Sequence, residues 1–269
     1  MKRKILLIIY ILSCVVLPAS AGDDFGLWAD VSAGKKITKR LSADADFGVR
    51  AEQNVTRIMR WEAGVGVAFK PVKFLKVGAG YTYLRDRRSG AVVAHYNSKG
   101  KMNGYNIEHD AWRNKHRLYL DATGSLPIGR FTLSLRERYQ YTRIMSVGVV
   151  EDKYRGIVSP GYVGKQYGGY AFDKTEIDEK SAKDKHYLRS RLAVEYNIRH
   201  CPVTPFISAE LSNNLADRLT LDKTRLTAGI DWKVAKQHKL TFAYLWQTGT
   251  DDEDADGLHV LKLGYRLNF

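Results

Sequence analysis

The chain has 269 residues, of which 44% are hydrophobic and 27% are charged, and its formal net charge at pH 7 is +14. Sixteen tyrosines and 23 glycines against six prolines favour an all-β chain over a helical one. Beyond residue 22 there is no apolar run of the roughly 18 residues that a membrane-spanning helix needs. These properties argue against a helical membrane protein.

Residues 1–21 have the organisation of a secretory signal peptide. A basic start at residues 2–4 precedes an apolar run over residues 5–17, and Ala19-Ser20-Ala21 forms a small-x-small cleavage site. We expect cleavage after Ala21; a lipobox-like Leu12-Ser13-Cys14 is the alternative. Cleavage leaves Cys201 as the only cysteine of a mature chain of residues 22–269, which excludes an internal disulfide.

Export also bears on the positive charge. Basic proteins often bind nucleic acid, but an exported protein rarely meets it, so we expect no nucleic-acid partner. Anionic lipopolysaccharide or an anionic solute is the better match for the charge.

Alternation with a period of two residues recurs along the mature chain and predicts strands with one apolar and one polar face. The last strand, residues 258–269, shows it clearly and ends on the aromatic Phe269, which suits a closing strand and an outer-membrane sorting signal. Eleven such segments occur, near residues 25–34, 41–52, 59–70, 75–83, 117–123, 131–141, 188–198, 207–211, 225–233, 239–247 and 258–269.

The connections between these segments alternate in length. Turns near residues 71, 127, 201 and 236 are short, whereas those at 86–112, 146–184, 213–218 and 249–257 are generally longer. Short periplasmic turns and long external loops are typical of outer-membrane barrels. The sequence therefore predicts an all-β fold, an antiparallel transmembrane β-barrel of 10–12 strands with long external loops. Because bacterial barrels have even strand numbers, we expect ten or twelve.

Several stretches carry a family resemblance. They are Asp24-Phe25-Gly26-Leu27-Trp28, the segment from Pro71 to Tyr81, Arg136-Glu137-Arg138-Tyr139 and the aromatic end. With them the mature chain resembles a family of Gram-negative outer-membrane barrels known only as a domain of unknown function, DUF2490. The resemblance implies a barrel in the cell outer membrane, surrounded by lipid and lipopolysaccharide and inserted by the barrel-assembly machinery. It implies no activity and no catalytic residues.

The polar faces of the predicted strands are rich in charge. The candidate lumen-lining residues are Arg50, Arg60, Lys76, Arg117, Arg136, Arg138, Arg189, Arg191, Arg225, Lys262, Arg266, Asp44, Asp46, Glu62 and Glu195. Two interpretations remain open: a salt-bridged plug that makes the barrel rigid, or a narrow pore that prefers anions. Oligomeric state is not indicated by the sequence.

Glu137 breaks the pattern. It shares the apolar face of its segment with Leu135 and Tyr139, which places a carboxylate toward lipid. A charge there costs up to a few kcal/mol, so Glu137 is an unexplained lipid-facing carboxylate.

The alternative function is an outer-membrane enzyme, or a lipid- or glycan-binding barrel, with its site in the 86–112 and 146–184 loops. Glu108-His109-Asp110 could hold a catalytic base there, but no motif marks a nucleophile. The acidic run 251–256 lacks the spaced ligands of an EF-hand. We therefore assign no catalytic residue, metal or cofactor.

Overall fold

The computed structural model describes residues 24–249 and 257–269. The predicted signal peptide and the acidic run 251–256 lie outside the described residues. No helix among the described residues is long and apolar enough to cross a membrane. The described chain divides into two compact units, a barrel and a separate five-stranded sheet.

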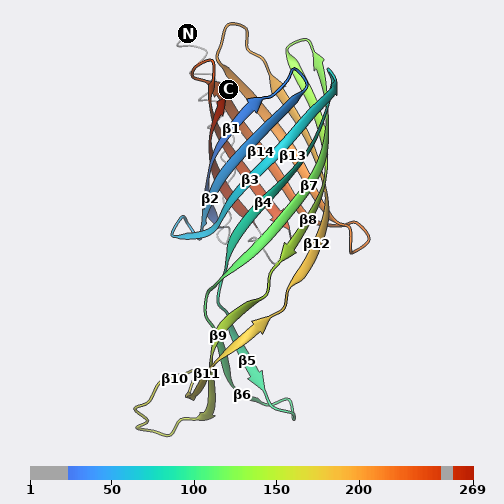
Figure 1. The fold of residues 1–269 in the computed structure, drawn as a ribbon. Helices are drawn as coiled ribbons and strands as arrows, with labels where there is room; N and C mark the ends of the chain where they lie inside the picture. The colour runs from blue at the N-terminus through green and yellow to red at the C-terminus, as the bar shows by residue number, and fades with distance from the viewer. Residues whose placement is uncertain (1–23, 250–256) are drawn as a thin grey trace. The chain divides into compact units, whose positions relative to one another are not determined.

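The barrel is a single closed sheet of eleven strands within the described residues (Figure 1). Its strands are β1 (Phe25–Lys36), β2 (Leu41–Glu52), β3 (Arg57–Val72), β4 (Leu75–Arg88), β7 (Ala111–Ile128), β8 (Phe131–Ile144), β12 (Lys183–Tyr196), β13 (Val203–Asn214), β14 (Thr220–Lys233), β15 (His238–Gly249) and β16 (Leu258–Asn268). They follow one another around the barrel in chain order, and β1 closes against β16. Each predicted segment coincides with one of these strands.

The strand number corrects the expectation of ten or twelve. Strands joined in succession reverse direction at every turn, so the first and eleventh point the same way. β1 accordingly pairs with β16 in parallel, from Phe25 opposite His259 to Gly34 opposite Asn268. The other side of β1 pairs with β2 in the antiparallel sense. The even-number rule was wrong for this chain because one parallel pair closes the sheet without leaving an edge.

The seam is tied at both ends by local hydrogen bonds. At one end the Asp24 carboxylate accepts the backbone N–H groups of Gln53 and Asn54, at 2.8 and 2.9 Å. These residues belong to the tight β2–β3 turn, where Gln53, Asn54 and Val55 all have positive φ. At the other end the N–H of Phe269 donates to the carbonyl of Gly34 at 2.8 Å.

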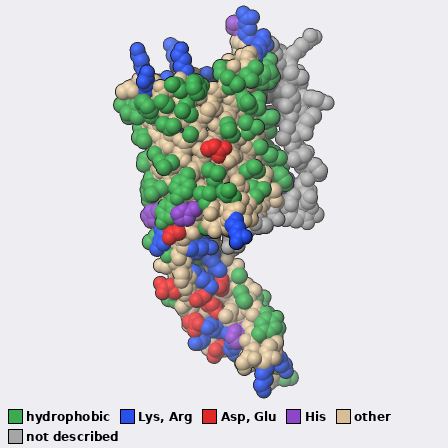
Figure 2. Space-filling view, turned by 90° about the vertical axis from the view of Figure 1, so that its right-hand side faces the viewer, with side chains coloured by type: hydrophobic (Ala, Val, Ile, Leu, Met, Phe, Trp, Pro, Cys, Tyr) green, Lys and Arg blue, Asp and Glu red, His purple; other side chains and the backbone are tan. Residues whose placement is uncertain are grey.

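The alternation of the strands separates an apolar outer face from a polar inner face. Val65, Leu120 and Ile207 are 57, 61 and 60% exposed, and they stand on the outside between residues that face inward. Figure 2 shows hydrophobic side chains covering the visible face of the barrel, with Lys and Arg at its ends. The buried apolar core is correspondingly small, since the barrel interior is filled with polar side chains.

The second unit corrects the expectation of two long loops. Residues 86–112 and 146–184 contribute to a five-stranded sheet in the order β10-β11-β9-β6-β5. Its strands are β5 (Val92–Tyr96), β6 (Met102–Glu108), β9 (Val147–Ile157), β10 (Gln166–Tyr167) and β11 (Tyr170–Lys180). Tyr105, Tyr154, Tyr167, Tyr170 and Phe172 pack their rings together in it, at centroid distances of 5.2–5.9 Å. These aromatic contacts supply a hydrophobic cluster outside the barrel.

The parallel seam can be tested by cross-linking in a Cys201→Ser background. The pairs Ala29→Cys with Leu263→Cys and Ala33→Cys with Leu267→Cys are in register and should both form disulfides, because facing Cα atoms lie within bridging distance. The crossed pairs, Ala29→Cys with Leu267→Cys and Ala33→Cys with Leu263→Cys, should stay reduced. Gel mobility without reductant measures the bond. Oxidation of the crossed pairs alone would mean that the seam is antiparallel.

Candidate functional site in the barrel lumen

A polar cavity of about 610 Å³ occupies the barrel interior. Thirteen of the predicted lumen residues line it: Asp44, Asp46, Arg50, Arg60, Glu62, Arg117, Arg136, Arg138, Arg189, Arg191, Glu195, Arg225 and Lys262. Lys76 and Arg266 do not. Lys76 is exposed beside the turn between β3 and β4, and Arg266 donates from Nε to Asn268 Oδ1 at 3.0 Å near the end of β16.

Other lining residues were not among the sequence candidates. They include Trp28, Asp30, Tyr119, Lys185, Glu210, Lys223, Asp231 and Lys239. Most were detectable in principle, because each alternates with an apolar neighbour on its strand. Glu210, for example, lies between the outward-facing Ala209 and Leu211. The period-two signal could therefore have found it.

Glu210 is the centre of the densest charge network in the lumen. Its carboxylate accepts Arg136 Nη2 at 2.7 Å and also binds Arg189, and Arg225 Nη1 lies 3.6 Å away. The side chain of Glu210 is only 8% exposed. Three guanidinium groups from β8, β12 and β14 thus converge on one carboxylate from β13. Arg189 and Arg225 are further held by the Gln140 and Gln247 side-chain oxygens, at 2.9 and 2.6 Å.

Further ion pairs link neighbouring strands along the inner wall. Arg138 Nη2 lies 2.5 Å from Asp121 Oδ2, Lys239 Nζ lies 2.6 Å from Asp231 Oδ2, Lys262 Nζ lies 2.9 Å from Asp30 Oδ2, and Arg50 Nη2 lies 3.4 Å from Glu62 Oε1. Each joins adjacent strands of the barrel order or strands one removed. Much of the charge in the interior is therefore paired.

The charges are distributed unevenly around the wall. The acidic residues Asp30, Asp44, Asp46 and Glu62 come from the adjacent strands β1, β2 and β3. The arginine pairs of β8 (Arg136, Arg138) and β12 (Arg189, Arg191) stand across the ring of eleven strands from them. An acidic wall and a basic wall facing one another set up a transverse electric field in the lumen.

Aromatic side chains pack against the arginines. Arg50 and Arg225 place their Cζ atoms 4.1 and 5.4 Å from the centre of the Trp28 ring, and Arg138 lies 4.0 Å from that of Tyr119. A Cβ at Gly80 would lie 2.3 Å from the Tyr119 hydroxyl. The glycine on the polar face of β4 therefore makes room for a ring inside the barrel.

Trp28 also belongs to a buried apolar cluster with Leu245, Leu258 and Val260. All four are at most 5% exposed. They come from β1, β15 and β16, so the cluster lies at the parallel seam. Charged side chains elsewhere in the lumen leave this part of the interior as its small hydrophobic core.

Glu137 has a partner that the sequence did not reveal. Ser190 Oγ donates a hydrogen bond to Glu137 Oε2 at 2.6 Å. Ser190 lies between Arg189 and Arg191, which face the cavity, so its own side chain points outward like that of Glu137. The pair joins β8 to β12 on the outer face and partly satisfies a carboxylate that alternation places toward lipid.

Histidines of the barrel pair with tyrosines on the outer face. The Oη-to-Nδ1 distances are 2.6 Å for Tyr81–His116, 2.8 Å for Tyr139–His186 and 2.7 Å for Tyr265–His238, and Tyr244 pairs with His259 in the same way. Interfacial tyrosines need a partner for the hydroxyl when their rings are half-buried. These histidines therefore satisfy the polar tips of an aromatic girdle.

The predicted Glu108-His109-Asp110 grouping is not brought together. His109 Nε2 lies 3.2 Å from Asp152 Oδ2, Glu108 binds Arg88 and Lys180, and Asp110 binds Arg87. Hydrogen bonds from Lys165, Thr175 and His109 hold the pKa of Asp152 below its usual range. No serine hydroxyl in the described part of the chain is hydrogen-bonded to a histidine.

The Glu210 network leads to a stability prediction. Glu210→Gln leaves three guanidinium groups around a neutral amide, and breaking such a network costs about 3 kcal/mol. The temperature at which the folded band disappears in SDS gels should fall by about 6–12 °C. Glu195→Gln is the matched control, since it removes a carboxylate from the same cavity at an exposed position. Equal melting of the two variants would contradict a central role for Glu210.

The Glu137–Ser190 pair leads to a second prediction, tested by a double-mutant cycle in lipid vesicles. Ser190→Ala should cost about 1 kcal/mol of unfolding free energy, because the carboxylate loses its donor. Glu137→Leu should leave the barrel as stable or more stable, because it removes a charge from the apolar face. In the Glu137→Leu background Ser190→Ala should cost nothing. A cost that is the same in both backgrounds would show that the two side chains do not interact.

Comparison with known proteins gives one family and two distant structures. No curated protein matches the chain. The translocator domain of the autotransporter NalP from Neisseria meningitidis is similar at 10% identity and a TM-score of 0.49, covering 80% of this chain and 72% of that one. The beta domain of the Bordetella autotransporter BrkA is similar at 12% identity and a TM-score of 0.45, covering 84% and 78%. The family described as "Protein of unknown function (DUF2490)" matches residues 25–257, most of the chain, and the protein belongs to that family.

Proposed function

We propose that the protein is an outer-membrane β-barrel whose lumen is a narrow passage that prefers anions. The membrane location is supported by the outer face. Exposed apolar residues such as Val31, Val65, Leu118 and Leu120 are spread over several strands, and a continuous apolar surface of this extent suits lipid rather than water. The surrounding partners are then outer-membrane lipid and lipopolysaccharide, with the barrel-assembly machinery acting on the strand that ends at Phe269.

The preference for anions is carried by one observation, the excess of positive charge around the cavity. Twelve Lys and Arg residues line it against seven Asp and Glu residues, an excess of five positive charges. A lumen lined by such an excess concentrates anions and repels cations. The transverse field between the acidic wall and the basic wall adds an orienting force on a dipolar or anionic solute.

The passage is narrow because side chains fill much of the interior. Arg136, Arg189 and Arg225 extend from three strands to meet at Glu210, and the Trp28 cluster occupies the interior at the seam. This arrangement also gives the barrel the rigid, salt-bridged interior of the structural alternative. The two functions differ only in whether ions cross.

The enzyme alternative has weaker support. His109 and Asp152 form an acid–base pair in the second unit, but Lys165 and Thr175 also bind the same carboxylate. Such full engagement stabilises a folded sheet, and a nucleophile within reach of His109 is not among its described hydrogen bonds.

Planar-bilayer recording tests the proposal. The refolded protein should give small single-channel steps, and a salt gradient should give a reversal potential of the sign expected for anion selectivity. Arg191→Gln removes one charge from the cavity wall and should move that potential toward zero. Arg199→Gln removes the same charge from the exposed turn between β12 and β13, outside the cavity lining, and should leave selectivity unchanged.

The opposite results would reject the channel. Absence of conductance steps from correctly folded protein means that the barrel is closed and structural. Steps with cation selectivity, or equal effects of the two arginine variants, would mean that the charged lumen does not control passage.

A further inference from the structure

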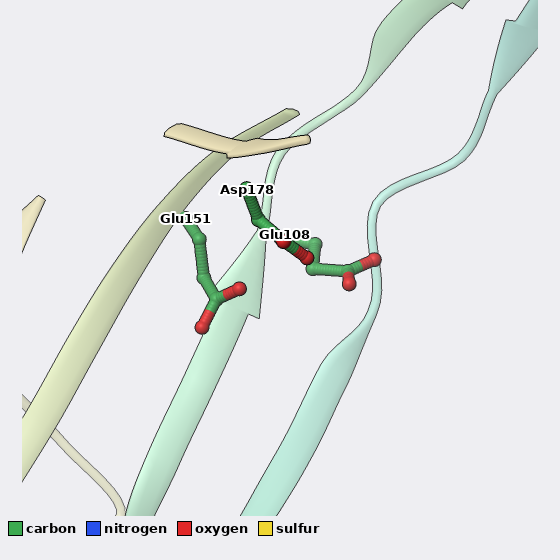
Figure 3. Close-up of side chains that lie close together, drawn as sticks. All are labelled: Glu108, Glu151 and Asp178. Atoms are coloured by element: carbon green, nitrogen blue, oxygen red, sulfur yellow. The ribbon is translucent and has the colours of Figure 1, made fainter. Parts of the chain in front are cut away.

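Three carboxylates converge in the five-stranded sheet outside the barrel. Glu108 comes from β6, Glu151 from the adjacent β9 and Asp178 from β11 on the other side of β9. One carboxylate oxygen from each lies within 4.8 Å of the others. Figure 3 shows the three side chains directed toward a shared space from three separate stretches of the chain.

The strand register forces these like charges together. Glu108 stands directly opposite Glu151 in the β6–β9 pair. Asp178 pairs with Val149, two residues from Glu151 on the same face of β9. Like charges directly opposite one another on neighbouring strands are destabilising. The arrangement therefore requires a cation to neutralise it.

Glu151 is the residue whose need is unmet. It is 5% exposed, and its Oε1 atom is buried without a hydrogen-bond donor among the described residues. A buried carboxylate oxygen with no partner carries a substantial desolvation cost. This second observation, independent of the clustering itself, points to a missing positive ligand on the Glu151 side of the cluster.

The cations already present act on the other two acids. Lys180 Nζ lies 2.6 Å from Glu108 Oε1 and 2.5 Å from Asp178 Oδ2, and Arg88 Nη1 lies 2.6 Å from Glu108 Oε2. Neither of them bonds to Glu151. Two positive charges thus serve three carboxylates, and Lys180 bridges two of the three groups that a bound metal ion would use.

We propose that Glu108, Glu151 and Asp178 form a calcium site in which Ca²⁺ competes with the Lys180 ammonium group. Carboxylate oxygens are ligands for hard cations, and Ca²⁺ sits about 2.3–2.6 Å from each of them. Oxygens up to about 5 Å apart can therefore share one Ca²⁺, whereas Mg²⁺, at about 2.0–2.1 Å, needs closer spacing. The bound ion would tie β6, β9 and β11 together and satisfy the Glu151 carboxylate.

Calorimetric titration of Ca²⁺ into the full chain tests the site, after chelator treatment and in micelles free of lipopolysaccharide. One ion per chain should bind with a dissociation constant of about 0.1–1 mM, as in extracellular calcium modules. Glu151→Gln should weaken binding at least tenfold. Glu179→Gln is the control, because it removes an exposed carboxylate from the same strand outside the cluster. Lys180→Met should strengthen binding about tenfold, since it removes the competing ammonium group.

Two results would overturn the site. One is the failure of both the native chain and Lys180→Met to bind Ca²⁺ at millimolar concentration. The other is equal binding by Glu151→Gln and Glu179→Gln, which would place any bound ion elsewhere, for example on the acidic run 251–256. Circular dichroism of each variant checks that the fold is kept.

Discussion

Closure of the sheet is the constraint from which the barrel follows. An open edge would present unpaired N–H and C=O groups, and these are costly in a lipid environment. Eleven strands in succession meet this constraint only if the first and last run parallel, as β1 and β16 do over ten residue pairs. Parallel pairing is slightly weaker per residue than antiparallel pairing. The Trp28 cluster and the Asp24 and Phe269 hydrogen bonds reinforce the barrel at this place.

Charge takes the part in the barrel interior that apolar packing takes in a globular protein. Glu210 and its three arginines connect four strands through one carboxylate, and cation–aromatic contacts at Trp28 and Tyr119 supply the rest. Such a core is costly to break because every member depends on its partners. It also leaves the interior polar, which is the condition for a lumen that admits ions. Rigidity and permeability thus arise from the same side chains.

The sequence predicted the barrel strands well because a wall between apolar and polar surroundings imposes a period of two on every segment. It failed where structure depends on contacts distant in sequence. The strands of the second sheet mix apolar and charged residues on one face, as Val149 and Glu151 do, so alternation gave no signal there. Ser190, the partner of Glu137, is 53 residues away. The convergence on Glu210 likewise depends on how β8, β12 and β14 are placed by closure.

The parallel seam has a consequence for the two ends of the barrel sequence. β1 begins beside the β2–β3 turn, where Asp24 binds Gln53 and Asn54, whereas β16 ends at Phe269 beside Gly34, after the full length of β1. In barrels closed by antiparallel strands the two ends emerge together, and a short peptide can join them. Here they emerge from opposite rims, so a circularly permuted chain would have to carry its new linker across the whole height of the wall.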